Sequence, residues 1–157
     1  MSAINKARDA EAPCITSGKT APIRVTYADT DRMNHAYHGS YLVWFEIGRT
    51  ELLRGFGQSY KSWEEDHHVF LPVRRCVVDY LVPALYDDEV VVETTIVRLT
   101  RASIEFDYRL LRVGDDALLA TAQTHHVFMS SEGRILRAGD KLLPQFFLKP
   151  NPHEARE

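Results

Sequence analysis

The apolar residues of this chain change their spacing once, and this change constrains the fold more than any other feature. In residues 39–54 they recur at helical intervals, as Tyr41, Phe45 and Leu52 illustrate. From Val69 onward they alternate with polar residues, which is typical of half-buried strands. One helical segment followed by several alternating segments predicts an α+β domain in which one long helix lies against an antiparallel sheet.

Four alternating segments form the predicted sheet, at residues 70–81, 89–101, 103–113 and 117–129. A shorter β-rich run at residues 23–27 precedes the long helix. Two short helices are expected at residues 58–66 and 140–147, with Asp140 as the cap of the second. Gly48 lies in the middle of the long helix, where glycine costs about 1 kcal/mol relative to alanine. We therefore expect this helix to pack very closely on a flat surface such as the sheet.

The ends of the chain lack this patterning. Residues 1–21 are small, polar and aperiodic, and residues 149–157 contain prolines and several charges. Both are expected to be loose segments around a single domain at residues 22–148, which suits a length of 157 residues.

The composition narrows the class of protein. A formal net charge of -3 argues against nucleic acid as the main partner, because phosphate backbones require a basic face. No run approaches the roughly 20 apolar residues that cross a bilayer, and the N-terminal region has no apolar core of a signal peptide. The two cysteines, Cys14 and Cys76, form no disulfide framework or CxxC motif, so a reduced, cytoplasmic location is expected.

Histidines are the remaining candidates for metal ligands. Six of them fall in close pairs: His35 with His38, His67 with His68, and His125 with His126. None of the pairs follows the HExxH spacing or has a cysteine partner, and adjacent histidines on a strand point to opposite faces. The sequence therefore predicts no metal site.

The most informative segment connects the first strand to the long helix. Residues 25–41 bring two acids, two histidines, an asparagine and tyrosines into one short connection. The first N–H groups of a helix lack partners within the helix and lie at the positive end of its dipole, so they can bind an oxyanion. A carboxylate about seven residues upstream can fold back to the same point. An acid beside an oxyanion site is a minimal arrangement for a hydrolase.

Residue types at fixed spacing make this segment specific. They are Asp29-Thr30-Asp31, then Tyr37-His38-Gly39-Ser40-Tyr41, then Glu46 and Arg49-Thr50-Glu51-Leu52-Leu53-Arg54. The pattern resembles the 4-hydroxybenzoyl-CoA thioesterase family of the hotdog superfamily. Its members read D-T-D-x-x-G-V-V-Y-H-x-x-Y, with E-x-A-R-x-E in the following helix. The resemblance extends over about residues 23–147. It implies an antiparallel sheet wrapped around one central helix, and hydrolysis of an acyl-CoA with no cofactor, since coenzyme A is part of the substrate.

The resemblance also implies roles for single residues. Asp31 is expected to be the catalytic carboxylate, either as a nucleophile or as a general base on water. The backbone N–H of His38 is expected to bind the oxyanion, and its ring could also touch the substrate or orient Asp31. Candidate substrate contacts are Asn34, His35, Tyr37, Tyr41 and Glu46.

Two departures from the family pattern leave the substrate class open. Asn34 stands where relatives have glycine, and asparagine tolerates a left-handed backbone, so the loop is expected to keep its shape. Met33 and His35 instead resemble another branch of the superfamily, which reads D-x-M-G-H-V-N-N-x-x-Y. The main expectation is therefore an acyl-CoA thioesterase. The alternatives are a thioesterase acting on acyl carrier protein and a hotdog protein that binds acyl-CoA without hydrolysing it.

Other interpretations of these residues also remain open. Asp29 is expected to bond loop amides, and Tyr41 to lie in the core with its hydroxyl paired. Glu46 could pair with Arg49 three residues later or line a pocket. Candidate contacts for the phosphates of coenzyme A are Arg74, Arg75, Arg98, Arg101 and Arg109. The sheet edges predict a homodimer that continues the sheet, and relatives often form a dimer of dimers, a homotetramer.

Overall fold

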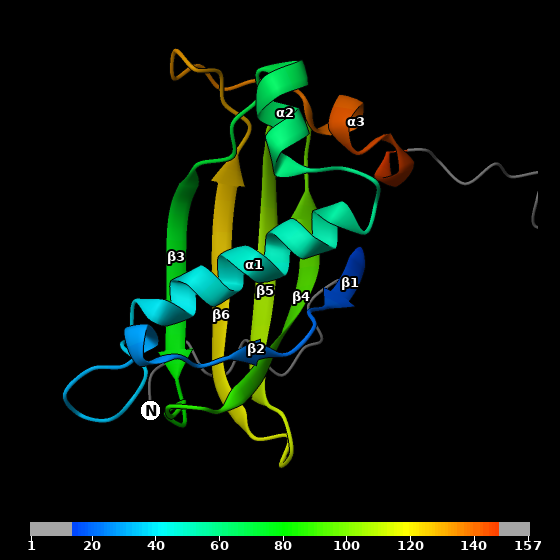
Figure 1. Ribbon diagram of the computed structural model, residues 1–157. Coiled ribbons are helices and arrows are strands. Elements are labelled where there is room, and N and C mark those ends of the chain that lie inside the picture. Colours follow the sequence, from blue (N-terminus) through cyan, green and yellow to red (C-terminus); the bar gives the residue numbers. More distant parts are fainter. Residues whose placement is uncertain (1–13, 148–157) are drawn as a thin grey trace, which may run out of the picture.

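The structure is a computed structural model, and it describes residues 14–147. An antiparallel sheet of six strands curves around the long helix α1, Ser40–Arg54 (Figure 1). The strands are β1 (Thr16–Lys19), β2 (Ile23–Arg24), β3 (Val73–Tyr80), β4 (Glu89–Leu99), β5 (Ser103–Arg112) and β6 (Leu118–Val127). The other elements are α2 (Tyr60–His67), α3 (Gly139–Leu142) and the 3-10 turns η1 (Tyr27–Asp29) and η2 (Pro144–Phe146). The predicted α+β class, with an antiparallel sheet around one central helix, is confirmed.

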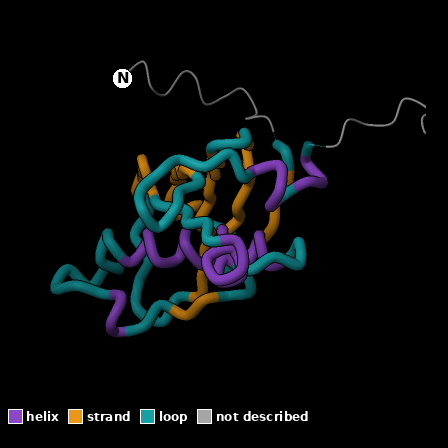
Figure 2. Tube along the Cα trace, turned by 90° about the horizontal axis from the view of Figure 1, so that it is seen from above, coloured by secondary structure: helices purple, strands orange, loops and turns teal. Residues whose placement is uncertain are grey.

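The main path of the sheet runs β1-β4-β5-β6-β3, and β2 also pairs with β4. Seen from above, the strands curve around α1 (Figure 2). Strand β3 lies at one end of the path and, within the described residues, pairs only with β6. Residues 73–76 of this strand are exposed. An exposed strand edge offers unpaired N–H and C=O groups to another strand.

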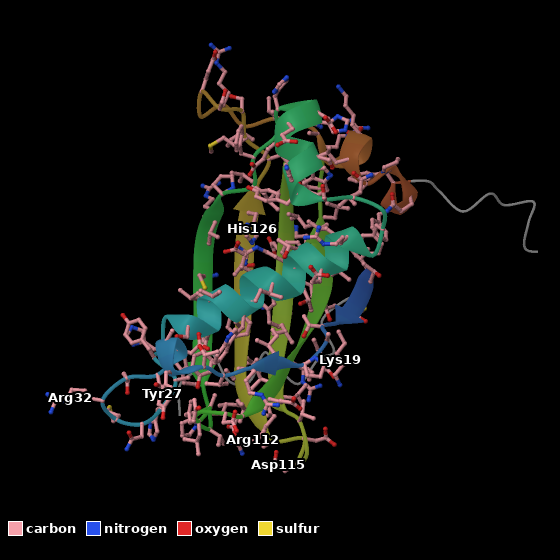
Figure 3. The ribbon with its side chains drawn as sticks, viewed as in Figure 1. Lys19, Tyr27, Arg32, Arg112, Asp115 and His126 are labelled. Atoms are coloured by element: carbon pink, nitrogen blue, oxygen red, sulfur yellow. The ribbon has the colours of Figure 1, made fainter. Side chains whose placement is uncertain are left out.

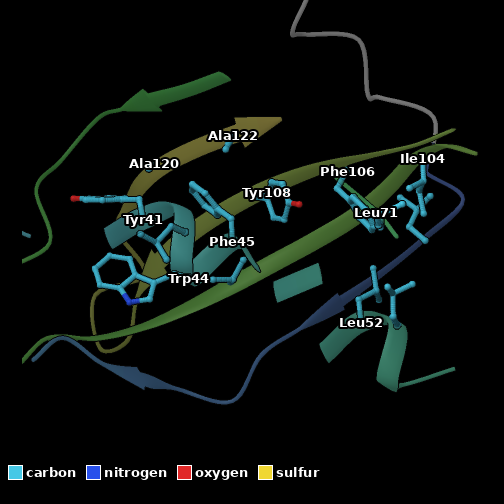
Figure 4. Packing of buried hydrophobic residues seen from close by; sticks show 14 of the residues in the cluster. Tyr41, Trp44, Phe45, Leu52, Leu71, Ile104, Phe106, Tyr108, Ala120 and Ala122 are labelled. Carbon is cyan, nitrogen blue, oxygen red and sulfur yellow. The ribbon is translucent and has the colours of Figure 1, made fainter. Parts of the chain in front are cut away.

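Helix α1 rests directly on the sheet, as the position of Gly48 predicts. A Cβ atom at this glycine would lie 2.5 Å from Oγ1 of Thr94 and 2.7 Å from Cγ1 of Val92, both on β4. One turn earlier, the buried ring of Phe45 lies 5.0 Å from the ring of Tyr108 on β5 (Figure 4). Contacts of this kind fix the distance between the helix and the sheet.

The N-terminal segment differs from the prediction. Residues 16–19, expected as part of a loose arm at residues 1–21, form strand β1 along β4. Four residues without clear alternation are too few to signal a strand, but the edge of β4 supplies their hydrogen-bond partners. The arm prediction is therefore wrong for β1. Residues 1–13 and the expected tail at residues 149–157 lie outside the described residues.

The closing segment also differs from the prediction. Helix α3 begins after Ala138, and Asp140 lies inside it rather than at its N-cap. Asp140 instead pairs with Arg101 at 3.1 Å. Pro144 then begins the separate turn η2, because proline lacks the N–H that a continuing α-helix needs.

Candidate active site

The loop before α1 presents Asp31 at the surface. Its Oδ1 accepts a hydrogen bond from the N–H of Met33 at 2.8 Å, and its own N–H donates to the carbonyl of His35 at 2.9 Å. This turn has a left-handed backbone at Asn34, with a φ of 62°. The predicted conformation of Asn34 is thus confirmed, because asparagine takes the place of glycine at such a position. The carboxylate of Asp31 is exposed and forms no ion pair with any described residue.

Asp29 supports this loop from within. Its Oδ2 accepts hydrogen bonds from the N–H and the hydroxyl of Thr26, at 2.8 and 2.9 Å. Its carbonyl accepts from the N–H of Tyr37 at 2.6 Å and from the hydroxyl of Ser40 at 2.9 Å. These bonds tie the first turn of α1 to the loop. They confirm that Asp29 bonds loop amides, as expected.

The N-cap of helix α1 is Gly39, and no side chain of the described residues donates or accepts a capping hydrogen bond there. The N–H of His38, just before it, has no acceptor among residues 14–147. The carbonyl of His38 accepts a hydrogen bond from the hydroxyl of Tyr80 at 2.8 Å, which holds the main chain at this point against β3. An unpaired N–H at the positive end of a helix dipole is suited to an oxyanion. Asp31 and this N–H therefore lie in one connection that hydrogen bonds hold in shape.

Tyr80 is a residue that sequence analysis missed. It lies 42 residues from His38, near the end of an edge strand, so no local spacing signals the contact. Partial burial raises the pKa of Tyr80, which keeps its hydroxyl protonated and able to donate. Its ring also packs edge-on against Tyr41, with 4.9 Å between ring centres.

Tyr41 belongs to the core. Only 2% of it is exposed, and its hydroxyl accepts a hydrogen bond from the N–H of Ala84 at 3.0 Å. The expectation of a core tyrosine with a paired hydroxyl is confirmed. The same burial corrects the expectation that Tyr41 contacts the substrate, because it leaves the residue almost no free surface.

Three other predicted substrate contacts share the loop with Asp31. Asn34 and Tyr37 are exposed, and His35 is half-buried, with its main chain in a β-bridge to Leu85. The ring of Tyr37 lies 4.3 Å from that of His38. Arg32 marks the tip of this loop, which projects past the sheet on the side of β3 (Figure 3). The roles of Asn34, His35 and Tyr37 toward a substrate stay predictions.

A cavity of about 260 Å³ lies farther along α1. Its walls include Glu46 and Arg49 of α1, Tyr60 of α2, and Leu71 and Val73 at the start of β3. Glu46 and Arg49 form no ion pair, so of the two open interpretations the structure favours Glu46 as a pocket residue. At about 1.5 Å per residue, the wall on α1 begins about 9 Å beyond the helix start and reaches about 20 Å. Within one chain, the cavity therefore lies along α1, whereas Asp31 lies in the loop before the N-terminus of α1.

The arginines proposed for coenzyme A divide into two groups. Three of them pair with carboxylates: Arg98 with Glu105 at 3.7 Å, Arg101 with Asp140 at 3.1 Å, and Arg109 with Glu93 at 2.6 Å. Arg74 and Arg75 are exposed and have no ion pair among the described residues. They follow Val73 at the wall of the cavity, so they are the better-placed candidates for an anionic group of the substrate.

Among residues 14–147, no group of three or more histidine, cysteine, aspartate or glutamate side chains is arranged to hold a metal ion. His125 and His126 point to opposite faces of β6, as expected: His126 is buried, and His125 lies 3.8 Å from Glu105. In the same part of the chain, no helix is long and apolar enough to span a membrane.

Comparison with known proteins identifies the family. Residues 25–153 match the model of the thioesterase-like superfamily, and this range contains the Asp31 loop and all of α1. The chain belongs to this superfamily. Over 98 residues it is 37% identical to the acyl-CoA thioesterase YbgC of Haemophilus influenzae, covering 62% of this chain and 72% of that protein.

Solved structures agree with this membership. The DHNA-CoA thioesterase of Staphylococcus aureus is similar with a TM-score of 0.76 and 26% identity, covering 83% of this chain and 86% of that chain. The 4-hydroxybenzoyl-CoA thioesterase of a Pseudomonas species is similar with a TM-score of 0.74, over 82% of this chain and 97% of that chain. At 19% identity the second comparison shows the fold alone. The fold of this chain is thus the hotdog fold of the thioesterases.

Proposed function

We propose that this protein is an acyl-CoA thioesterase in which Asp31 is the catalytic carboxylate. The observation that carries the proposal is that an exposed carboxylate and the unpaired N–H of His38 at the start of α1 belong to one hydrogen-bonded loop. Membership of the thioesterase-like superfamily and similarity to an acyl-CoA thioesterase support it.

The reaction follows from this arrangement. The carbonyl oxygen of the thioester docks against the N–H of His38, which stabilises the negative charge that develops on it. Asp31 either attacks the carbonyl carbon or takes a proton from a water molecule that attacks it. The C–S bond breaks, and the thiolate of coenzyme A leaves and takes up a proton. If Asp31 attacks, water then hydrolyses the mixed anhydride between Asp31 and the acyl group, which frees the carboxylate. In both routes water supplies the new oxygen of the acid. A thiolate leaves readily, so the step needs no strong acid beside the sulfur.

We further propose that the working form is a homodimer, built by pairing β3 with its counterpart in a second copy. In such a dimer the Asp31 loop of one copy would approach the cavity of the other, which lies toward β3. Pairs of dimers would give the tetramer expected from relatives. We also propose a cytoplasmic location, where the exposed thiols of Cys14 and Cys76 stay reduced.

A carrier-protein thioester is the second candidate substrate. Acyl carrier proteins are acidic, and the exposed, unpaired Arg74 and Arg75 beside the cavity wall would suit such a partner. Reversal of both charges, Arg74→Glu with Arg75→Glu, would then reduce turnover of the acyl carrier protein more than turnover of the matching acyl-CoA. An equal loss on both substrates would favour coenzyme A, whose phosphates need the same charges.

The test of the proposed function is release of free thiol from short aliphatic, long aliphatic and aromatic acyl-CoAs. Asp31→Asn should reduce kcat at least about 100-fold, because it removes the nucleophile or base and keeps the shape of the side chain. Asp116→Asn makes the same change at an exposed aspartate outside the site and should keep wild-type kcat. Full turnover by Asp31→Asn would refute the assignment. Binding of acyl-CoA without thiol release by the wild type would instead indicate a non-catalytic binder.

A further inference from the structure

A chain of buried hydrogen bonds runs beneath the cavity. The hydroxyl of Tyr108 on β5 lies 2.6 Å from Oγ1 of Thr124 on β6, which lies 2.7 Å from Nε2 of His126. Nδ1 of His126 lies 3.2 Å from the carbonyl oxygen of Leu71, a residue of the cavity wall. The three side chains are 1–2% exposed. Figure 3 shows His126 on β6, between the sheet and α1.

The direction of these hydrogen bonds can be assigned. Burial, and then the positive charge of Arg49, lower the pKa of His126 to about 4, so its ring is neutral near pH 7. The carbonyl of Leu71 can only accept, so Nδ1 donates to it and Nε2 accepts from the hydroxyl of Thr124. The oxygen of Thr124 then accepts from Tyr108, whose pKa is raised by burial and which therefore keeps its proton.

Arg49 lies near this chain. Its positive charge lowers the pKa of Tyr108, against the larger effect of burial. Arginine is always charged and carries five N–H donors that can bind a ligand. Arg49 is half-buried, lines the cavity and has no ion pair among the described residues. Glu46, the other charged residue of the wall, lies one turn away on the helix and forms no ion pair with Arg49.

A half-buried charge without a counter-ion is costly, unless a ligand supplies the opposite charge. The cavity of about 260 Å³ is slightly smaller than the usual range for small-molecule sites, so it suits a short group. A hydrocarbon tail in the cavity would strip water from the guanidinium and leave its donors unpaired. A tail that ends in a carboxylate would accept hydrogen bonds from it in the two-pronged geometry that arginine favours.

We propose that Arg49 is a specificity-determining residue, which selects short acyl groups that carry an anionic group, such as a carboxylate, at the end remote from the thioester. The proposal rests on the proposed thioesterase function. Tyr108, Thr124 and His126 are the positioning residues of this proposal: their hydrogen bonds fix the hydroxyl of Tyr108, which responds to the charge of Arg49, and the neutral ring of His126 adds no second positive charge.

The test compares two acyl-CoAs of five carbons, glutaryl-CoA and pentanoyl-CoA, with enzyme-free blanks to correct for spontaneous hydrolysis. We expect the wild type to favour glutaryl-CoA by at least about tenfold in kcat/KM, because a site built for a polar group rejects the analogue that lacks it. Arg49→Met should abolish this preference, and Arg49→Lys should keep part of it. Arg54→Met changes an arginine on the same helix that pairs with Glu51 at the surface, and it should leave the ratio unchanged.

The ratio separates a role in specificity from a role in folding. A wild type with equal kcat/KM on both substrates would overturn the proposal, as would an Arg49→Met variant that loses activity on both in equal proportion. If Arg49→Met does not fold, Tyr108→Phe removes only the buried hydroxyl near Arg49 and should lower the preference for glutaryl-CoA. If that preference is absent, but the wild type hydrolyses some acyl-CoA and Asp31→Asn does not, the proposed function stands while this inference fails. No thiol release from any acyl-CoA would overturn both.

Discussion

The Asp31 loop before α1 and the cavity wall around Arg49 are stabilised by different kinds of contact. At the N-terminal end, Asp31 is exposed, and its loop is held by hydrogen bonds between Asp31 and its near neighbours Met33 and His35. Farther along the helix, Arg49 is half-buried in the cavity wall, near buried hydrogen-bonded side chains from two strands, Tyr108 among them. The first arrangement is local and suits chemistry that must meet water. The second is long-range and suits the recognition of a substrate group that must be separated from water.

The largest loss of kcat is expected from a change to the main chain at His38. His38→Pro removes the N–H and should reduce kcat by about 100-fold or more, because loss of one oxyanion donor costs about 100- to 1,000-fold. His38→Ala keeps the N–H and should reduce kcat by less than about tenfold. Circular dichroism of both variants would check that α1 still forms. Equal losses would show that the ring of His38 acts, and the account of the helix end would be wrong.

The buried hydrogen bonds of His126 should make the stability of the fold depend on pH. His126 has a pKa of about 4 in the folded chain and 6.5 as its ordinary value, so between these values the unfolded chain binds the proton more strongly. Stability is therefore lost as the pH falls from about 6.5, by about 2–3 kcal/mol on approaching pH 4. Urea unfolding of the wild type at pH 7 and pH 4.5 measures this loss. In His126→Gln the loss should be smaller, and a pH dependence identical to that of the wild type would exclude His126 as its source.

A smaller effect is expected at Tyr80, which links the exposed end to the sheet. Tyr80→Phe removes the hydrogen bond to the carbonyl of His38 and keeps the packing of the ring against Tyr41. Loss of one hydrogen bond at about 1 kcal/mol predicts a fall in kcat of up to about fivefold and a fall in Tm of about 2–4 °C. Steady-state kinetics would measure it, and an unchanged kcat would mean that the helix start does not depend on β3.

Local features of the fold and site could be predicted from the sequence. The close approach of α1 follows from Gly48, and the left-handed turn follows from Asn34, because in both cases the residue type itself limits the backbone. The supporting role of Asp29 is equally local, since its partners lie within eleven residues.

Features that depend on distant strands could not be predicted in this way. Strand β1 exists because β4 offers it an edge, and Tyr80 reaches His38 across 42 residues. The buried chain of hydrogen bonds left one signal in the sequence. Thr124 and His126 continue the buried alternation of β6 with polar side chains, and a polar residue at a buried position requires a hydrogen-bond partner. The pattern does not identify that partner.

In the proposed dimer, the Asp31 loop of one copy acts together with the cavity of the other copy. Thr50 lines the cavity, and Thr50→Trp should fill it. Dimers of Asp31→Asn alone and of Thr50→Trp alone should each be nearly inactive, since every site carries one defect. Mixed dimers, isolated with two affinity tags, combine both defects in one site and leave the other intact. We predict that they recover about half of the wild-type rate of thiol release, because one of two equivalent sites is restored. Mixed dimers no more active than the two parent variants would contradict the claim.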